Sequence, residues 1–410
     1  MNMSEDELQK VVDQTIGSEE TAQEKKRTKR CGWGIKVTAI VVLILLGVLA
    51  GVLPFLFKNH YLDFVFGGDT SNNRPTGWQG NDTDSNEGHH NNSSYDLDPR
   101  LTRSFWGIDY TPNGAQMEYG CSISQDDVVE DLKLLHQLTP RLRLYGLDCG
   151  QGYYVMNGMK TLNIDMGVIL TIWVDGNATT YERQYNAFWK LLDQFGADHI
   201  SGVSVGNEAL YREQIKPAEL IERIRNVKSN LKERGYDHIP VYTTDIRSLP
   251  DIMPEEDQVL DNVHPFFAGV TVDQAPSWTW KYFKDVVIVP TIRLARSKGI
   301  DQVKPALISE VGWPTAPESR VYQGAVPSLK NLEKLLFSFV CQSNQKGVPY
   351  YWFEFKDAPW KNATFGEPRE AFWGLFDKDR QLKVPRLPNC PLPLFKNGDV
   401  SVPQPGFAFQ

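Results

Sequence analysis

From residue 101 onward, short apolar runs alternate with amphipathic stretches. The apolar runs are rich in β-branched and aromatic residues and predict eight strands. They are SFWGIDY (104–110), RLRLYG (141–146), GVILTIW (167–173), ISGVSVG (200–206), PVYTT (240–244), LDNVH (260–264), PALISE (305–310) and PYYWFE (349–354). Between them, apolar residues recur at helical spacing and predict helices at 124–138, 181–195, 216–235 and 328–347.

This alternation indicates the α/β fold class. Strands separated by helices pair in parallel, because each right-handed crossover returns the chain to the same edge of the sheet. Eight such units fit a (β/α)8 barrel, and an open doubly wound sheet is the alternative. The sequence has no Gly-rich phosphate loop after the first predicted strand, which favours the barrel.

A different pattern precedes these runs, because residues 37–57 contain no charged side chain. A helix of this length rises about 30 Å, which matches the hydrocarbon core of a bilayer. Basic residues gather before it, whereas Lys58 is followed by very few. This asymmetry predicts a single transmembrane helix in the cell membrane, of type II, with a cytoplasmic N-terminus and an extracellular remainder. The preceding basic residues are Lys25, Lys26, Arg27, Lys29, Arg30 and Lys36.

Composition divides the chain into five segments. Residues 1–36 predict a disordered cytoplasmic tail and residues 37–57 the membrane helix. Residues 58–100 are rich in Gly, Asn, Asp and Ser and predict a flexible, glycosylated stalk. Residues 101–390 are the predicted barrel, and residues 391–410 are a C-terminal tail. Acceptor triplets for N-glycosylation begin at Asn81, Asn91, Asn92, Asn177 and Asn362.

Four of the five cysteines lie on the predicted extracellular side, where disulfides persist. Four cysteines allow three pairings. We expect Cys121–Cys149 and Cys341–Cys390, because each pair joins near neighbours in the sequence.

Charge and motif content exclude several function classes. The formal net charge is −8 at pH 7, so the protein would repel phosphate and is not expected to bind nucleic acid. The seven histidines show no spacing typical of metal ligands, and no nucleotide-binding loop occurs. We therefore expect a monomer without a metal or another cofactor.

Two predicted strands end in a glutamate. SGVSVGNEALYR (201–212) stops at Asn207-Glu208, and KPALISEVGWPT (304–315) stops at Glu310. Active sites of (β/α)8 barrels form at the C-terminal ends of the strands, where a carboxylate is held rigidly and is partly desolvated. A single strand-end glutamate fits a helix cap equally well. Two of them across one barrel mouth favour an active site.

A pair of carboxylates suits the hydrolysis of a glycosidic bond. One is protonated and donates to the leaving oxygen, while the other is ionised and attacks the anomeric carbon. A separation of ~5 Å gives retention through a covalent glycosyl-enzyme, and a larger one admits water and gives inversion. Asn207 is suited to hydrogen-bond a sugar hydroxyl, so we assign Glu208 as the acid/base and Glu310 as the nucleophile.

These residues also carry a family resemblance. VGNEALYR and ISEVGWPT resemble the two active-site motifs of glycoside hydrolase family 17, the β-1,3-glucanases, and stand in the family's order. RLRLYGLDC, NVHPFF, DQAPSWTW, YYWFEFKDAPWK and FWGLFD support it, and their context is most similar to the fungal, membrane-anchored type II branch. The resemblance implies a (β/α)8 barrel and a retaining mechanism with Glu208 as acid/base and Glu310 as nucleophile.

Matched position by position, the resemblance implies a set of residues that line the substrate cleft. Trp173, Trp278 and Trp360 fit sugar platforms and core packing equally well. Lys356 departs from the pattern, because the family's usual FEAFDEPWK has a small or acidic residue there, and this leaves substrate contacts near the eighth strand open. The implied cleft residues are Tyr110, Tyr145, Asp148, Asn207, His264, Phe266, Trp313, Glu354 and Lys361.

The expected activity is that of a retaining endo-β-1,3-glucanase that acts on cell-wall β-glucan from the outer side of the cell membrane. Its partners would be β-1,3-glucan poly- or oligosaccharide and, through one helix, membrane lipid. A β-1,3-glucanosyltransferase is the alternative, because it uses the same two glutamates and differs only in the acceptor. A non-catalytic glucan-binding membrane protein is a third hypothesis, but such a protein needs no acid–nucleophile pair.

Overall fold

A computed structural model describes residues 95–247, 249–299 and 303–392 of the chain. The predicted cytoplasmic tail, the membrane helix at 37–57, and most of the stalk and of the C-terminal tail lie outside the described residues. The predictions for those segments stay predictions. Within the described ranges, no helix combines the length and the apolar character needed to cross a bilayer.

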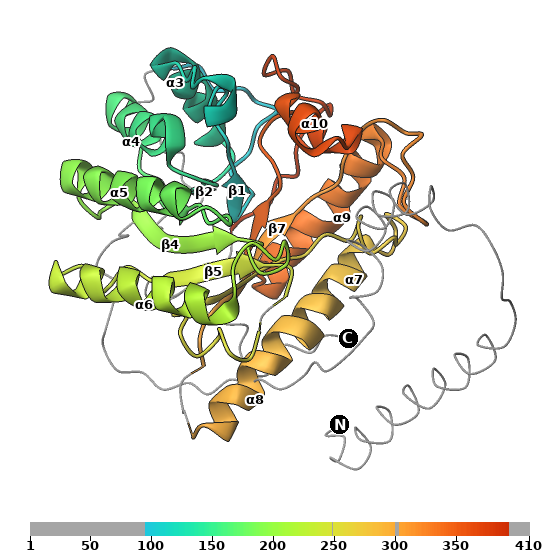
Figure 1. Cartoon of the computed structure of the whole chain (residues 1–410). Coiled ribbons are helices and arrows are strands. Elements are labelled where there is room, and N and C mark those ends of the chain that lie inside the picture. The colour runs from blue at the N-terminus through green and yellow to red at the C-terminus, as the bar shows by residue number, and fades with distance from the viewer. Residues whose placement is uncertain (1–94, 248, 300–302, 393–410) are drawn as a thin grey trace, which may run out of the picture. The chain divides into compact units, whose positions relative to one another are not determined.

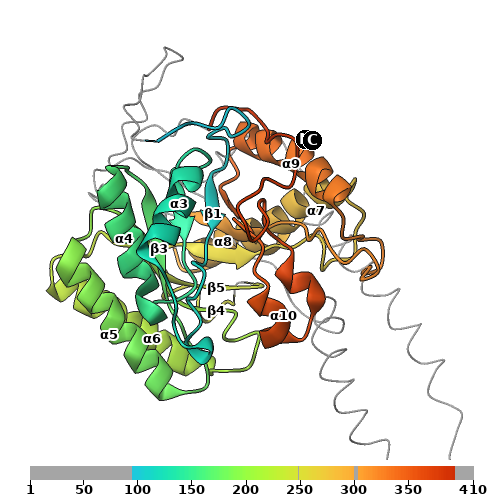
Figure 2. The same cartoon turned by 90° about the horizontal axis from the view of Figure 1, so that it is seen from above.

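Eight parallel strands close into a barrel in the order of the sequence, with β8 paired to β1. All eight predicted strands are present, and the closure excludes the open doubly wound sheet. Figures 1 and 2 show the helices packed around the outside of the strands. The strands are β1 (Gly107–Asp109), β2 (Arg141–Arg143), β3 (Gly167–Ile172), β4 (Ile200–Asn207), β5 (Val241–Asp245), β6 (Val259–Asn262), β7 (Ala306–Val311) and β8 (Tyr350–Trp352).

The four predicted helices correspond to α3, α5, α6 and α9. The predicted starts of α3 and α9 agree with their caps, because Ser124 and Ser328 accept hydrogen bonds from first-turn backbone N–H groups, and α9 ends at Gly347 as predicted. Helix α5 begins at Ala178, before the predicted start at residue 181. The helices are α3 (Gln125–Leu135), α4 (Gln151–Leu162), α5 (Ala178–Phe195), α6 (Pro217–Glu233), α7 (Ala275–Tyr282), α8 (Val289–Ser297), α9 (Leu329–Lys346) and α10 (Trp360–Phe365). Short 3-10 helices are η2 (Met117–Tyr119), η3 (Asp148–Gly150) and η5 (Pro368–Ala371), and the π-helix η4 (Phe283–Ile288) joins α7 to α8.

Helix α4 was not predicted, because its glycines weaken the helical signal. The structure shows that one of these glycines, Gly158, is needed for helix packing. A Cβ atom at Gly158 would lie 2.6 Å from Leu132 on α3, so the glycine allows α3 and α4 to pack closely. Helices α7 and α8 were also not predicted, because each has a proline as its second residue and a π-helix interrupts the regular spacing between them.

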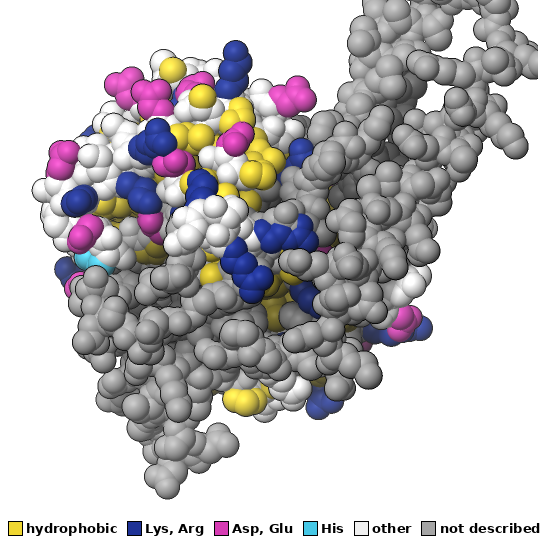
Figure 3. Space-filling model, turned by 90° about the horizontal axis from the view of Figure 1, so that it is seen from below, with side chains coloured by type: hydrophobic (Ala, Val, Ile, Leu, Met, Phe, Trp, Pro, Cys, Tyr) yellow, Lys and Arg dark blue, Asp and Glu magenta, His cyan; other side chains and the backbone are white. Residues whose placement is uncertain are grey.

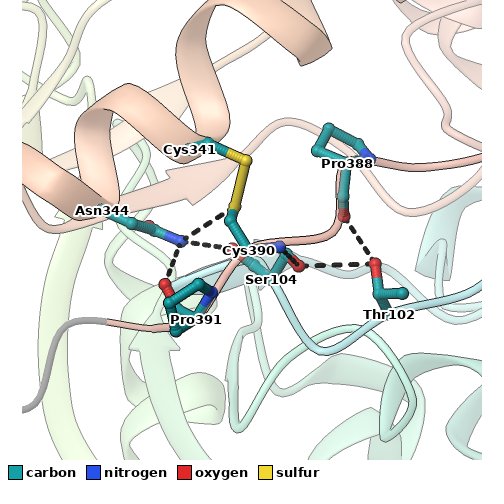
Figure 4. The surroundings of a disulfide bond; sticks show 7 residues. All are labelled: Thr102, Ser104, Cys341, Asn344, Pro388, Cys390 and Pro391. Carbon is teal, nitrogen blue, oxygen red and sulfur yellow. Dashed lines mark hydrogen bonds between the residues drawn. A yellow bond between two sulfur atoms is a disulfide. The ribbon is translucent and has the colours of Figure 1, made fainter.

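Both predicted disulfides are present, Cys121–Cys149 and Cys341–Cys390. Figure 4 shows the second, which joins α9 to the segment that leaves the barrel. Beside it, the Ser104 hydroxyl accepts a hydrogen bond from the Cys390 backbone N–H at 3.0 Å, and Asn344 donates to the Ser104 carbonyl at 2.9 Å. The segment that enters the barrel and the segment that leaves it are therefore fastened together before β1.

The first described residues reach the same end of the barrel. The Tyr95 hydroxyl lies 2.8 Å from Nδ1 of His136, and the Asp98 backbone N–H donates to the Gln137 side chain at 2.8 Å. His136 and Gln137 follow α3, where the chain returns to the start of β2. Residues 95–104 therefore lie at the N-terminal ends of the strands.

Figure 3 shows one face of the molecule, seen from below. On the described part of that face, Lys and Arg side chains are interspersed with Asp and Glu, and hydrophobic side chains form a band between them. Charges of both signs at close spacing give the described part of this face no strong field of one sign.

Candidate active site

Glu208 occupies a sharp turn at the end of β4. Its backbone φ is +51°, a left-handed conformation that is uncommon for residues other than glycine, and it follows Gly206 at φ +84°. The Glu208 backbone N–H donates to the Thr244 carbonyl on β5 at 2.7 Å. The chain thus leaves the barrel wall directly at Glu208 and presents its carboxylate at the strand end. Such backbone conformations gather at functional sites.

Glu310 lies on β7 and is nearly fully buried, with 6% of its side chain exposed. Oε1 accepts hydrogen bonds from Arg143 Nη1 at 2.9 Å and from the Tyr145 hydroxyl at 2.8 Å. Oε2 lies 2.9 Å from Nε2 of His264, just beyond β6. Groups from β2 and β6 therefore fix both carboxylate oxygens.

Arg143 connects several residues of the site through its guanidinium group. This fully buried side chain on β2 crosses the barrel interior and also contacts Asp109 Oδ1 on β1 at 3.2 Å. Its Nη2 donates to the Oδ1 atom of Asn207 at 2.7 Å and to the Thr244 hydroxyl at 2.9 Å. One guanidinium therefore positions both Glu310 and the residue that precedes Glu208.

The carboxylate of Glu208 has weaker partners and is more accessible, with 20% of its side chain exposed. Oε1 accepts a hydrogen bond from Asn262 Nδ2 on β6 at 2.8 Å, and Oε2 lies 3.2 Å from Arg212 Nη1. Arg212 in turn lies over the Trp173 ring, 4.9 Å from its centroid. Trp173 therefore contacts this arginine from the end of β3.

These surroundings move the two pKa values in opposite directions. Burial raises the pKa of Glu310, but hydrogen bonding to His264 and the charge of Arg143 outweigh it and lower the pKa to about 2. Burial raises the pKa of Glu208, and the negative charge of Glu310 raises it further, against the opposing effect of Arg212. One carboxylate is thus held ionised while its neighbour retains a proton more readily, which is the division of roles that glycoside hydrolysis requires.

Comparison with known proteins identifies the domain. The family model of the BtgE/BtgC glycoside hydrolase domain matches residues 107–374, which is more than half of the chain. The chain belongs to the BtgE/BtgC glycoside hydrolase family.

Curated relatives of the chain include proteins from Aspergillus species. The chain is 38% identical over 314 residues to the probable glucan endo-1,3-beta-glucosidase btgC of Aspergillus fumigatus, and the match covers 71% of this chain and 44% of that protein. The protein of the same name from Aspergillus oryzae is 37% identical over 335 residues, which cover 75% of this chain and 48% of that protein. The chain thus spans less than half the length of these relatives.

Solved structures agree with the family and the fold. The glycoside hydrolase family 17 β-1,3-glucanosyltransferase from Rhizomucor miehei is 27% identical, with a TM-score of 0.59 over 70% of this chain and 99% of that one. An active-site mutant of that enzyme has been solved in complex with laminaritriose. An endo-laminarinase from Formosa, 16% identical with a TM-score of 0.56, shares the fold. The family 17 resemblance read from the two motifs is confirmed.

In this BtgE/BtgC domain, five of the predicted site residues lie in one hydrogen-bonded network: Tyr145, Asn207, Glu208, His264 and Glu310. Their contact with substrate stays a prediction.

Glu354 and Lys361 form a separate buried pair, with Lys361 Nζ 2.6 Å from Glu354 Oε1. Burial raises the pKa of Glu354 to about 7, against the charge of Lys361. Lys361 Nζ also lies 4.3 Å from the centroid of the Phe353 ring, which contacts His264 edge-on.

Four other predicted cleft residues have different surroundings. Tyr110, Phe266 and Trp313 are almost completely buried, with at most 1% of each residue exposed. Their contact with substrate stays a prediction. Trp313 packs edge-on against Phe266 and donates from Nε1 to the Val326 carbonyl. The Asp148 carboxylate is paired with Arg183, at 2.6 and 2.8 Å, outside the Glu310 network.

Lys356, the departure from the family pattern, does not enter this network. Its ammonium is buried against both carboxylate oxygens of Asp131 on α3, at 2.7 and 2.6 Å. The same carboxylate accepts hydrogen bonds from the Tyr110 hydroxyl and from Arg380 Nε, each at 2.7 Å. This cluster ties β1, α3 and the segment after β8 together outside the barrel, which leaves the surroundings of the two glutamates unaffected by the lysine.

Asp131→Ala is expected to destabilise the domain by about 3–5 kcal/mol, because it leaves the buried Lys356 ammonium without its carboxylate. Lys356→Met is the matched control and should cost less, since Asp131 keeps Arg380 and the Tyr110 hydroxyl. Urea denaturation followed by circular dichroism measures both free energies of unfolding. Equal losses in the two variants would contradict this account of the cluster.

The pH dependence of kcat/KM follows from the two shifted glutamates. Glu310 stays ionised throughout mildly acidic solution, whereas Glu208 loses its proton as the pH rises through its raised pKa. Activity is therefore expected to fall on the alkaline side. Arg212→Met should move that limb to higher pH, because loss of the cation raises the pKa of Glu208 further.

Profiles of kcat/KM for a soluble β-1,3-gluco-oligosaccharide measure this shift. The control is Arg234→Met, which removes another arginine that lies over a tryptophan, and should leave the profile unchanged. If the alkaline limb of the kcat/KM profile stayed at the same pH in Arg212→Met, Glu208 would be excluded as the titrating acid.

Proposed function

We propose that this chain is a retaining endo-β-1,3-glucanase that acts on cell-wall β-glucan. The observation that carries the proposal is the opposite shift of the pKa values of Glu208 and Glu310 at the C-terminal mouth of the barrel. Curated relatives named glucan endo-1,3-beta-glucosidase support the substrate class.

The surroundings of Glu310 favour retention over inversion. Inversion requires a base that takes a proton from water, and a carboxylate with a pKa of about 2 is a poor base. The same carboxylate is ionised and fixed by Arg143, Tyr145 and His264, which suits direct attack on the anomeric carbon. In this mechanism a bond forms between Glu310 and that carbon while Glu208 transfers its proton to the departing glycosidic oxygen.

The charge coupling between the two glutamates also explains the second step. Once Glu310 is esterified by the sugar, it no longer carries the negative charge that raises the pKa of Glu208. Glu208 then holds its proton less tightly and acts as the base that activates water. Asn207 contributes by orientation: three donors (Arg143, Thr244 and Asn262) bind its Oδ1, so its amide nitrogen is the group available to a sugar hydroxyl.

Transfer to a second sugar is the alternative outcome of the same glycosyl-enzyme. It is favoured by the similarity to the Rhizomucor miehei β-1,3-glucanosyltransferase. Mass spectrometry of the products from an end-labelled β-1,3-gluco-oligosaccharide separates the two activities. Shorter products alone support hydrolysis, and products longer than the substrate support transfer. A folded protein that makes neither would contradict both activities.

The chain is further proposed to be a single-pass type II membrane protein whose barrel is extracellular. The uncharged stretch at 37–57 and the basic residues before it support this topology. Protease added outside intact cells should remove the barrel and spare a tag at the N-terminus. Loss of the N-terminal tag would show the reverse orientation.

A further inference from the structure

Three large apolar side chains are exposed on two neighbouring loops at the mouth of the barrel. Met117 and Tyr119 on η2 are 50% and 53% exposed, and Phe365 at the end of α10 is 59% exposed. The first loop follows β1 and the second follows β8, so both lie at the catalytic ends of adjacent strands. Exposed apolar side chains that gather in this way mark interaction surfaces. Met117, Tyr119 and Phe365 are called the rim cluster below.

A hydrogen bond joins the two loops, because the Tyr119 hydroxyl lies 3.0 Å from the Thr364 hydroxyl on α10. The Trp360 ring, on the same helix, lies 6.3 Å from the ring of Phe365. Aromatic side chains from two separate segments are thereby held at one place.

The loop that carries Tyr119 is fixed at both ends. The Cys121–Cys149 disulfide ties it to η3, and the Ser122 backbone N–H donates to the Gly114 carbonyl at 2.9 Å. Gly114 has a φ of +76°, and a Cβ there would lie 2.5 Å from the Ser122 backbone. The rings therefore stand in place before a ligand arrives, which lowers the entropy cost of binding.

Helix α10 connects the rim cluster to the catalytic network. Lys361 on this helix pairs with Glu354 and lies over the Phe353 ring, which contacts both Tyr145 and His264, the two side chains bound to Glu310. Phe365 is four residues beyond Lys361, so it lies on the same side of the helix about one turn, or ~6 Å, farther out. The rim cluster is therefore linked to the proposed active site through α10 and Phe353.

We propose that the rim cluster binds glucosyl residues of the same β-1,3-glucan chain, beyond those held at the two glutamates. This inference rests on the proposed glucanase function. A β-glucopyranose ring carries its hydroxyls around its edge and presents apolar C–H faces, which match the flat faces of Tyr119 and Phe365. The hydroxyls of Tyr119 and Thr364, which lie 3.0 Å apart, are neutral hydrogen-bonding groups that suit sugar hydroxyls. The cluster would give the enzyme a preference for long chains.

The test compares kcat/KM for a long substrate, a laminari-decasaccharide, with that for laminaritetraose, using the full-length chain in detergent. All variants carry Asn362→Gln, so that no glycan attached at that triplet covers the rings. Phe365→Ala and Tyr119→Ala should each lower the long-to-short ratio by about five- to tenfold, as expected for loss of one aromatic contact. Phe337→Ala on α9, which removes another exposed ring, is the control and should leave the ratio unchanged.

Calorimetry on the inactive Glu310→Gln variant gives a second readout. Adding Phe365→Ala to it should weaken binding of the decasaccharide more than binding of the tetrasaccharide. The rim proposal would be overturned if both rim variants kept the parent's long-to-short ratio of kcat/KM, or if affinity fell equally for both substrates. The glucanase function would remain intact in either case. Absence of turnover of either substrate by the parent chain, together with absence of binding, would contradict the proposed function itself.

Discussion

Glu310→Gln is expected to lower kcat on β-1,3-gluco-oligosaccharides by about 10⁴-fold or more, because it removes the proposed nucleophile. The amide has nearly the volume of the carboxylate, and Arg143 keeps Asp109 as a buried partner. The variant should therefore remain folded, as thermal unfolding and circular dichroism would establish. Activity within tenfold of the parent would exclude Glu310 as the nucleophile.

Azide provides a sharper test of this assignment. In Glu310→Ala, azide can enter the space left by the carboxylate and attack the anomeric carbon of an activated glucoside from the nucleophile's side. The expected product is a glycosyl azide of inverted configuration, which nuclear magnetic resonance identifies. A product of retained configuration would assign Glu310 to the acid/base role instead. Exposed Glu219, replaced by Ala, is the control and should give no azide product.

Glu208→Gln is expected to slow cleavage of unactivated glucan by about 10²- to 10⁴-fold, because the leaving oxygen departs without a proton. An aryl glucoside with a good leaving group needs no such proton, so its first step should be nearly unaffected. The glycosyl-enzyme should then accumulate, since Glu208 is also the proposed base of the second step. Pre-steady-state release of the aryl group would appear as a burst.

The contrast between substrates makes this result specific. Asn262→Ala removes the donor to Glu208 Oε1 without removing the acid, so it should slow both substrates to a similar and smaller extent. If Glu208→Gln also slowed both substrates equally and gave no burst, Glu208 would not be the acid/base.

The sequence allowed prediction of the barrel because most of the strands are short apolar runs and several are separated by helical stretches. It also located Glu208 and Glu310, because a carboxylate that ends such a run has a defined position in this fold. The arginine that connects several residues of the site was missed. Arg143 lies within RLRLYG, where alternating charges indicate a strand with one solvent-facing side, and only barrel closure shows that this side chain points into the interior.

The directions of the predicted cleft side chains could not be derived from the sequence. Neighbouring residues of a strand point to opposite faces. At the end of β1, Asp109 contacts Arg143 inside the barrel, whereas Tyr110 donates to Asp131 on α3 outside it. The match of motifs gives a residue's place along the chain but not the face on which it lies. Asn262 was passed over in LDNVH for a related reason, because its partner Glu208 comes from a strand 54 residues away in sequence.

The place where the chain enters and leaves the barrel has a mechanical consequence. Residues 95–104 and 388–391 lie together at the N-terminal ends of the strands, away from Glu208 and Glu310. A force applied through whatever precedes residue 95 would pass into α9 by way of Ser104, Asn344 and the Cys341–Cys390 bond. Any pull on the chain before residue 95 would therefore enter the domain at the end of the barrel opposite the two glutamates.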